Sequence, residues 1–343
     1  MKIAGKAFND MPWEQMLARN SQEELTYLLE RLGIADAWRN SLQEPQTFLE
    51  GYFLDNPESF LQLFSEETFD LLLDIWDEKH LSELVDIDRK HLIILEKFGF
   101  LEYNDRTRTI EINREAKNNF YFLFKSRAAQ KQKERYREME YTVKGILYFY
   151  GIVVLTQMYD IIKKQYDIPF SEFSNFLKAR MELWDFLGIF KDTQREEYYA
   201  VSYEVRERNR IFAEHMRRPE QDYATLDAED AAFLGRMSGV GNWRGTAQLL
   251  EYSLKVLYED AMPATVFVKT ILMDIQNGNS LEMVRRKLYP KMEDFSEEEK
   301  ETVLYHIKEM YWHTPIYQLK GHSRYETEEK ANRFSIIEGG RRD

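Results

Sequence analysis

Two clusters of basic side chains are the residues of this sequence best suited to chemistry, and that chemistry would be contact with phosphate. The first cluster consists of Lys125, Arg127, Lys131, Lys133, Arg135 and Arg137. The second consists of Arg206, Arg208, Arg210, Arg217 and Arg218. Glu134 interrupts the first cluster, and Glu207 and Glu214 interrupt the second. If the clusters lie side by side, they form a basic stripe for phosphate contact; the alternative, which we favour, is solvated helix faces paired with local acids.

A segment near residue 315 places a Thr-Pro step and a Lys-Gly step between two histidines. Its marked residues are His313, Thr314, Pro315, Lys320, Gly321 and His322. Proline fixes φ and glycine permits a chain reversal, so we interpret the segment as a hydrogen-bonded structural turn. No His-x-x-x-His spacing occurs nearby, and we therefore expect no metal site.

Signatures of catalysis are absent from the sequence. The chain has no cysteine, which excludes disulfides, thiolate metal sites and a thiol nucleophile. The Gly-rich run 238–245 lacks Gly-Lys-Ser/Thr and follows a helical pattern, so it does not predict a phosphate loop. There is also no Gly-x-Ser-x-Gly nucleophile turn. We therefore expect no catalytic residues and no cofactor, and an enzyme of unrecognised type remains the third hypothesis.

Composition indicates which kind of protein must position these residues. A chain of 343 residues with 43% hydrophobic and 14% aromatic side chains predicts two to four domains with well-packed cores. Its 15 glycines and 8 prolines favour a mainly helical fold. The first residues do not form a signal peptide, and the longest uncharged stretch, 145–159, is too short to span a membrane. We expect a cytoplasmic protein without membrane contact, and a buried helix followed by a short strand or turn over 145–159.

Capping residues, prolines and glycines predict several helix boundaries. Ser21 with Glu24 forms a predicted capping box, and Gly33 is the predicted end of that helix. Pro45 is expected to open a helix, Ser65 another, and Ser296 a last helix that runs through Trp312. Residues 222–312 are predicted to be helical with breaks at 239–245, Pro263 and Gly278.

A helix–Gly–hairpin pattern occurs twice, about 89 residues apart. An apolar stretch from Leu81 to Phe98 leads through Gly99 to two predicted strands around 104–107, with Ile110 and Ile112 in the second strand. Gly188 repeats Gly99 as an expected left-handed helix cap, and Tyr199 and Val201 repeat the two isoleucines. This pattern predicts α+β architecture, mainly α with small β-hairpins, in which tandem winged-helix-like units are flanked by helical domains.

The predicted division of the chain follows from these patterns. Residues 1–64 form an N-terminal helical region, 65–120 the first winged-helix-like unit, and 121–140 a charged connecting helix within a longer helical stretch, 114–141. Residues 141–205 form the second winged-helix-like unit, 220–325 a C-terminal helical domain, and 326–343 a polar, loose tail.

The faces that a winged helix would present to DNA are charge-balanced or acidic. In the first unit the predicted face carries the cations Arg89, Lys90 and Lys97 and the anions Asp86, Asp88 and Glu96. In the second unit Lys178 and Arg180 stand against Glu172, Glu182 and Asp185. A phosphate backbone needs several unopposed cations, and the chain has a formal net charge of −13. This argues against duplex recognition by the usual face.

Three features together resemble a group of uncharacterised proteins of Gram-positive bacteria associated with a C-terminal SEC-C zinc motif. The helix pair from Glu23 to Ile34 is similar to SAP or Rho N-terminal-like modules, the middle is winged-helix-like, and the segment from His313 to Ser323 is similar to one that precedes the zinc motif. The Cys-rich zinc tail has no counterpart in this Cys-free chain. The group has no agreed activity, so the resemblance implies architecture and no zinc function.

These observations favour a non-enzymatic binding or adaptor protein that uses tandem winged-helix-like units, with protein partners preferred. Sequence-tolerant DNA or RNA binding through the clusters at 125–137 and 206–218 is the alternative. The sequence does not determine the oligomeric state.

Overall fold

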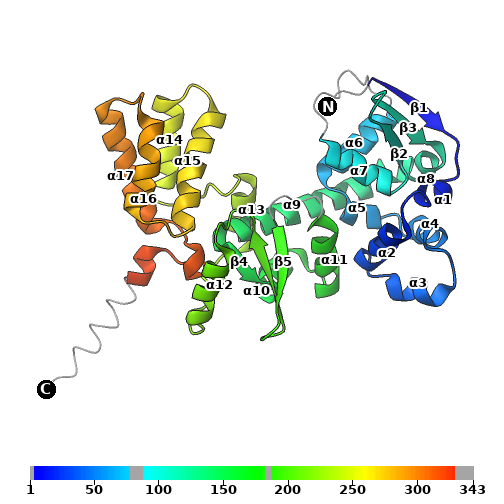
Figure 1. Cartoon of the computed structure of the whole chain (residues 1–343), viewed down its shortest axis with the longest axis horizontal. Helices are drawn as coiled ribbons and strands as arrows, with labels where there is room; N and C mark the ends of the chain where they lie inside the picture. Colours follow the sequence, from blue (N-terminus) through cyan, green and yellow to red (C-terminus); the bar gives the residue numbers. More distant parts are fainter. Residues whose placement is uncertain (1–3, 78–87, 182–186, 329–343) are drawn as a thin grey trace. The chain divides into compact units, whose positions relative to one another are not determined.

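A computed structural model of the chain describes residues 4–77, 88–181 and 187–328. It contains two compact units, one formed by Met1–Glu138 with Ile168–Asp185 and the other by Met139–Asp167 with Phe186–Asp343. Each unit has many helices and one small three-stranded sheet (Figure 1). The prediction of a mainly helical fold with small sheets is confirmed.

The elements of the first unit come mostly from the first third of the chain. They are β1 (Gly5–Asn9), α1 (Trp13–Leu17), α2 (Gln22–Arg31), α3 (Ala35–Ser41), α4 (Pro45–Asp55), α5 (Ser59–Leu63), α6 (Glu66–Trp76), α7 (Arg89–Lys97), β2 (Leu101–Asn104), β3 (Thr109–Asn113), α8 (Arg114–Phe124) and α11 (Phe170–Met181). The part of the predicted helical stretch at 81–87 lies outside the described residues.

Helix α9 (Arg127–Tyr150) begins in the first unit and ends in the second. The second unit continues with β4 (Ile152–Val154), α10 (Leu155–Tyr166), β5 (Leu187–Asp192), β6 (Glu197–Ser202), α12 (Arg208–Arg217), α13 (Ala228–Arg236), α14 (Thr246–Tyr252), the π-helix η2 (Ser253–Leu257), α15 (Ala261–Gln276), α16 (Leu281–Leu288), the 3-10 helices η3 (Tyr289–Met292) and η4 (Tyr317–Leu319), and α17 (Glu297–His313) between these two.

The predicted helix starts are confirmed by their caps. The Ser21 hydroxyl accepts a hydrogen bond from the amide of Glu24, whose carboxylate accepts from the Ser21 amide, and Ser296 with Glu299 repeats this capping box. The Ser65 hydroxyl caps α6, and Pro45 is the first residue of α4. These hydrogen bonds join residues at most three positions apart, so they stabilise the helix starts without any tertiary contact.

Aromatic rings fill the core of the first unit. Trp13 is fully buried, and its indole donates a hydrogen bond of 2.9 Å to the carbonyl of Phe98. The rings of this core come from α4, α5, α6, α8, the ends of α5 and α7, and the residue before β2. They are those of Phe53, Phe60, Phe64, Trp76, Phe98, Phe100, Phe120 and Phe124. Such large buried rings account for the high aromatic content of the sequence.

The two sheets share their strand order but not their strand directions. Their orders are β1-β3-β2 and β4-β6-β5, so in both sheets the last strand in the chain lies in the middle. Strand β1, which the sequence analysis missed, pairs parallel to β3, whereas β4 pairs antiparallel to β6. The two predicted hairpins are confirmed as β2–β3 and β5–β6.

No single offset superimposes the two hairpins. Their turns end in left-handed residues, Arg108 and Glu196, which are 88 residues apart. The buried Ile110, however, matches the buried Tyr199, 89 residues on. A shift of one residue exchanges the two faces of a strand, so the repetition is not exact. Gly188 was also predicted wrongly as a helix cap: it lies inside β5 opposite Val201, outside the left-handed region, because β5 begins one residue before this glycine, whereas β2 begins two residues after Gly99.

Two predicted helix boundaries are wrong. The expected single helix over 114–141 is interrupted at Lys125 and Ser126, because the Ser126 hydroxyl accepts a hydrogen bond from the amide of Ala129 and starts a new helix. Pro263 does not break the chain; it lies in the first turn of α15, where a missing amide proton removes no helical hydrogen bond. The helix and strand expected over 145–159 are confirmed by the end of α9 and by β4. The predicted loose tail, 326–343, is wrong at its start, because residues 326–328 continue a short helix that begins at 324; residues 329–343 lie outside the described residues.

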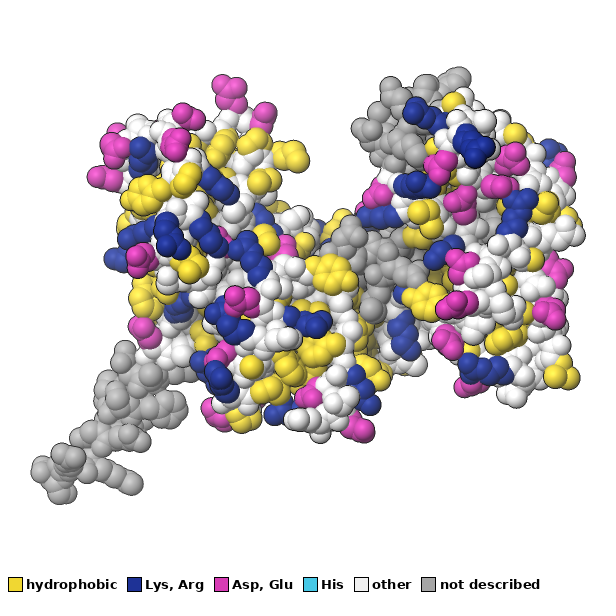
Figure 2. All heavy atoms as spheres, viewed as in Figure 1, with side chains coloured by type: hydrophobic (Ala, Val, Ile, Leu, Met, Phe, Trp, Pro, Cys, Tyr) yellow, Lys and Arg dark blue, Asp and Glu magenta, His cyan; other side chains and the backbone are white. Residues whose placement is uncertain are grey.

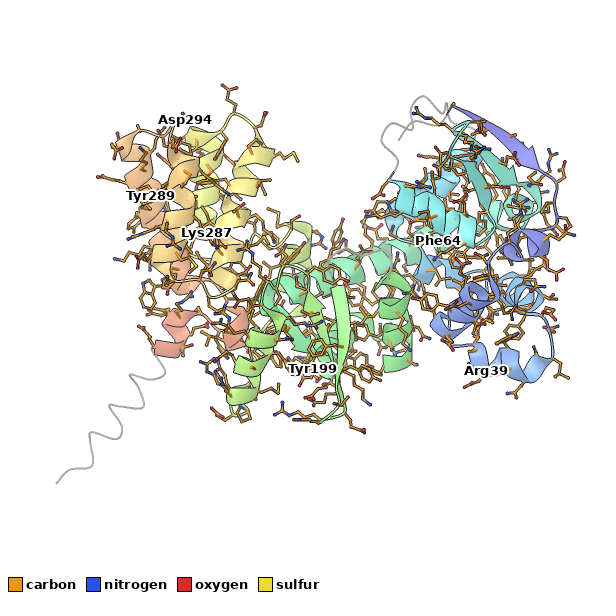
Figure 3. The ribbon with its side chains drawn as sticks, viewed as in Figure 1. Arg39, Phe64, Tyr199, Lys287, Tyr289 and Asp294 are labelled. Carbon is orange, nitrogen blue, oxygen red and sulfur yellow. The ribbon has the colours of Figure 1, made fainter. Side chains whose placement is uncertain are left out.

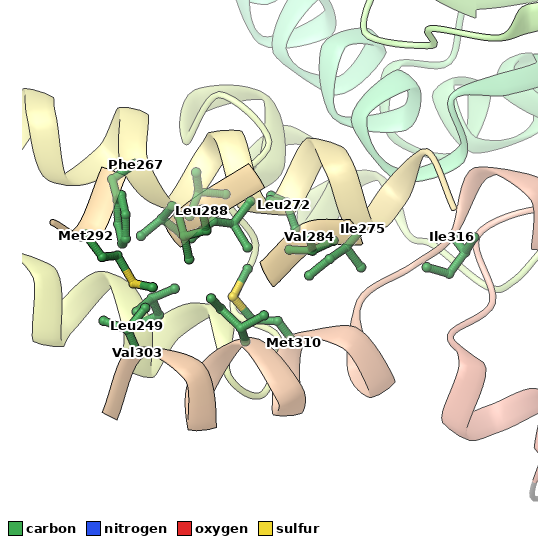
Figure 4. Packing of buried hydrophobic residues seen from close by; sticks show 14 residues of the cluster. Leu249, Phe267, Leu272, Ile275, Val284, Leu288, Met292, Val303, Met310 and Ile316 are labelled. Atoms are coloured by element: carbon green, nitrogen blue, oxygen red, sulfur yellow. The ribbon is translucent and has the colours of Figure 1, made fainter. Parts of the chain in front are cut away.

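The C-terminal helices of the second unit surround an aliphatic core. Figure 4 shows side chains from α14, α15, α16 and α17 converging on one another, including Leu249, Leu272, Val284, Leu288 and Met310. All five are at most 3% exposed. This core fixes α15 beside α16, which is the arrangement that positions the basic side chains described below.

Helices α9 and α13 approach each other through glycine. A Cβ atom placed on Gly145 of α9 would lie 1.7 Å from the carbonyl oxygen of Ala231, and one placed on Gly235 of α13 would lie 1.9 Å from the carbonyl oxygen of Tyr141. The two backbones are therefore in direct contact at both positions.

Candidate binding surfaces

Three cations of the first basic cluster form ion pairs with carboxylates of α6 or with Asp77, the residue that follows α6. Lys133 lies 2.7 Å from Asp70, and Lys125 lies 2.5 Å from Asp77. Arg137 pairs with Glu66 at 3.0 Å and also with Glu134. These ion pairs hold α9 and the end of α8 against α6, and they leave few charges for a ligand.

The other three members of this cluster differ in their surroundings. Arg135 is half-buried and has partners of its own. Arg127 and Lys131 are exposed and have no ion pair within the described part of the chain. The first cluster therefore offers two open cations rather than a continuous basic face.

Reversing the charge of Lys133 should test this structural role. Its side chain is only 13% exposed, so Lys133→Glu would hold a third carboxylate beside Asp70 and Glu66. We expect the free energy of unfolding to fall by about 1–2 kcal/mol, between the effects of surface and buried ion pairs. Urea denaturation measures this change, and Lys131→Glu is the matched control, expected to be close to neutral. Equal effects of the two variants would contradict the structural role.

The second cluster lies wholly in the second unit and is only partly paired. Arg217 and Arg218 both lie within 3.4 Å of Glu214, and Arg210 pairs with Glu207. Arg208 lies over the ring of Phe190, 5.3 Å from its centre. Arg206 differs from the others, because its partner is the buried carboxylate of Asp274 on α15.

Two lysines that the sequence did not indicate as site residues line the same hollow as Arg206. Arg206, Lys287 and Lys291 line a hollow of about 240 Å³ between α15, α16 and the residues before α12. Figure 3 labels Lys287 on α16, and Figure 2 shows basic side chains gathered over this region. The run Arg285-Arg286-Lys287 was visible in the sequence, but nothing in it indicated that Lys287 meets Arg206, about 80 residues away. We call this feature the basic hollow.

The Thr-Pro segment folds against the residues that follow α12. Lys320, in a left-handed conformation, donates hydrogen bonds of 2.9 and 2.6 Å to the carbonyls of Arg218 and Gln221. Burial lowers the pKa of this lysine. His322 lies 3.2 Å from the carbonyl of Asp222. Thr314, Ile316 and Tyr317 are buried, so this segment is part of the packed structure.

The remaining members of the segment also have local partners. His313 lies 3.9 Å from Glu309. Gly321 (φ 85°) lies against the rings of Phe149 and Tyr150, where a Cβ atom would come within 2.7 Å of both. A hydrogen bond with His322, together with those of Ser323, lowers the pKa of Glu326 to about 2.

His215, on α12, contacts the same segment and was not singled out in the sequence. Its Nε2 lies 2.6 Å from the carbonyl oxygen of Tyr317, which can only accept, so Nε2 carries the proton. Its Nδ1 is buried without a hydrogen-bond partner among the described residues. Burial, aided by the charges of Lys320 and Arg218, lowers the pKa of His215 to about 4, so the ring is neutral.

The predicted recognition faces of the winged-helix-like units are not open basic surfaces. Arg180 is 2% exposed, and its guanidinium lies 3.4 Å from the carbonyl of Leu61 on α5. Its assignment to an exposed face is therefore wrong, because α11 packs against α2 and α5. On α7, Arg89 pairs with Asp105. Asp86, Glu182 and Asp185 lie outside the described residues.

A second hollow, of about 300 Å³, is lined mainly by apolar side chains of α13, α14 and η2. Phe233, Met237 and Leu254 line it and are 44%, 40% and 42% exposed. The wall at Leu254 is π-helical, since the amide of Tyr258 donates to the carbonyl of Ser253, five residues back. We call this feature the apolar groove; the sequence predicted its residues only as helical, with a break at 239–245, and did not indicate a groove.

The described ranges 4–77, 88–181 and 187–328 contain neither a candidate metal site nor a candidate membrane span. Within them, no three His, Asp or Glu side chains gather in a way that could hold a metal ion. No helix there combines the length and the apolar composition needed to cross a bilayer. No protein-family model, curated protein or solved structure matches the chain.

Proposed function

We propose that this chain is a non-enzymatic binding protein whose apolar groove holds an amphipathic helix of a protein partner. The observation that carries this proposal is the exposure of Phe233, Met237 and Leu254 around one hollow. Contiguous apolar side chains at a protein surface mark interaction sites, because leaving them in water costs free energy.

The shape and composition of the apolar groove favour a helix as its occupant. Its walls are themselves helical, and helix-in-groove recognition uses apolar anchors spaced by three or four residues. Methionine suits such a groove because its flexible side chain adapts to different anchors. The π-helical turn at Leu254 is of a kind that occurs often at functional sites.

We further propose that the two sheets belong to winged-helix-like units that serve as scaffold. Along the chain, α9, β4, α10, α11, β5 and β6 follow the helix–strand–helix–helix–strand–strand order of that fold, although α11 packs within the first compact unit. Both sheets place their last strand in the middle. The pairing of the charges on α7 and the burial of Arg180 favour protein contacts over DNA contacts for these units.

Site-specific cross-linking tests the groove. A photo-reactive amino acid in place of Leu254 should cross-link to a different protein in the native host cells, and Phe233→Glu should abolish the adduct. The same probe at Tyr305, which is 58% exposed on α17, is the control and should give no such adduct. The proposal fails if position 254 gives no adduct, gives the adducts seen at Tyr305, or cross-links only to a second copy of the chain.

A further inference from the structure

We propose that the basic hollow binds a small phosphorylated ligand through a mono- or diphosphate group. Its cations, Arg206, Lys287 and Lys291, converge from the residues before α12, from α16 and from η3. Asp274 is the one anion among the described side chains that line it, so these residues carry two net positive charges. This site is distinct from the apolar groove and does not depend on the proposed protein partner.

Asp274 holds two of the cations in place. Its carboxylate is 7% exposed and accepts a hydrogen bond of 2.9 Å from Lys287, a second of 3.0 Å from Asn279, and a third from Arg206. The Arg206 and Lys287 side chains are both 45% exposed. Each charged group therefore uses one N–H to contact Asp274 and keeps other N–H donors open to solvent. Cations fixed in advance lose less conformational freedom when they bind an anion.

The backbone around Arg206 is fixed as well. Its amide donates a hydrogen bond of 2.9 Å to the Asn277 side chain, which is 4% exposed. A planar guanidinium matches the oxygens of phosphate, and the two ammonium groups add charge without directional demand. The buried Ile271, Val284 and Leu288 form the apolar floor, which limits screening of these charges by water.

Size and charge favour a discrete phosphate group over nucleic acid. The hollow, at about 240 Å³, is smaller than most sites for drug-sized ligands, which start near 300 Å³. The neighbouring Arg210 and Arg217 are paired with Glu207 and Glu214, so they do not extend the positive surface along a polymer. A chain with net charge −13 also repels a long polyanion.

Titration calorimetry of the full chain with pyrophosphate and with inorganic phosphate tests the proposal. At about 50 mM NaCl we expect pyrophosphate to bind and Lys287→Gln/Lys291→Gln to weaken it by about tenfold or more. The matched control, Lys164→Gln/Lys308→Gln, removes two exposed lysines of the same unit and should bind as the wild type does. Lys291→Gln alone leaves in place both cations that contact Asp274 and should still weaken binding about threefold.

A parallel titration distinguishes a small phosphorylated ligand from the phosphate backbone of nucleic acid. A short RNA strand and a DNA duplex should bind no more tightly than pyrophosphate at about 200 mM NaCl, because the hollow holds one mono- or diphosphate group and the rest of a polymer gains no further cations there. The proposal is overturned if pyrophosphate does not bind, or if the lysine and control variants bind it equally. It is also overturned if only nucleic acid binds, with an affinity that falls steeply with salt and depends on Lys287 and Lys291.

Discussion

Replacing Gly145 with alanine should lower the free energy of unfolding of the second unit by about 3 kcal/mol or more. The added methyl group would lie 1.7 Å from the carbonyl oxygen of Ala231, which is less than half of a normal contact distance. The obstacle is backbone rather than a side chain, so no rotamer change relieves the clash. Helices α9 and α13 must separate, and overpacking of this kind costs 1–3 kcal/mol even where side chains can move.

The contact is reciprocal, which gives the prediction a second test. Gly235→Ala would place its methyl group 1.9 Å from the carbonyl oxygen of Tyr141, so it should have a similar effect. Once one substitution has pushed the helices apart, the second should cost less, and the double variant should lose less than the sum of the two single losses.

Thermal and urea denaturation, followed by circular dichroism, measure these changes. Gly51→Ala is the matched control, because the residue is inside α4 and, apart from its neighbours and the backbone of its own helix, no atom lies within 4 Å of the added methyl group. Alanine is the better helix former, so this control should be neutral or stabilising by up to about 1 kcal/mol. If Gly145→Ala has the same denaturation midpoint as the wild type, the close approach of α9 and α13 is wrong.

Acidification should destabilise the protein through His215. Its pKa is about 4 in the folded chain and 6.5 in the unfolded chain. Between these values the unfolded state binds more protons, so the free energy of unfolding rises with pH from about 4 to 6.5. The contribution is fully present above 6.5 and falls by about 2 kcal/mol at pH ~5 and about 3 kcal/mol at pH ~4.

The physical cause is the position of the second proton. Protonation would place a charge on Nδ1, which is buried without a partner among the described residues and lies near the charges of Lys320 and Arg218. Nε2 already donates to the Tyr317 carbonyl, so that hydrogen bond does not offset the cost of the charge.

Urea denaturation at pH ~7 and pH ~5 separates His215 from other titrating groups. His215→Gln retains an amide that can donate to Tyr317 but cannot be protonated in this range. The wild type should lose about 2 kcal/mol more than this variant on acidification. Equal losses would show that His215 is not the group responsible.

Features that could be predicted from the sequence are those set by neighbours along the chain. Ser21, Ser65 and Ser296 cap their helices because hydroxyl and amide are three residues apart, and no tertiary contact is needed. Strand β1 was missed because it forms only by pairing with β3, about 100 residues away. Gly188 was misplaced because register in a hairpin depends on which partner strand is available.

The residues of the candidate sites were even harder to predict, because they meet through contacts between distant parts of the chain. The sequence singled out Arg206 by its charge, but Asp274, Lys287 and Lys291 meet it only through the packing of α15 against α16. Conversely, Lys125, Lys133 and Arg137 share a sequence cluster, yet each is directed to an acid on α6 or at its end. Local charge density predicts a ligand site poorly when the opposing acids come from another helix.

The path of the chain has a consequence for how this protein can be dissected. The polypeptide passes from one unit to the other inside α9, after Glu138, and again after Asp167 and Asp185. Neither unit is a continuous stretch, so no single cut releases one of them whole, and a fragment that ends at residue 138 lacks α11. Exchange of one unit for another by recombination would therefore need a junction at each of the three crossings, after Glu138, Asp167 and Asp185.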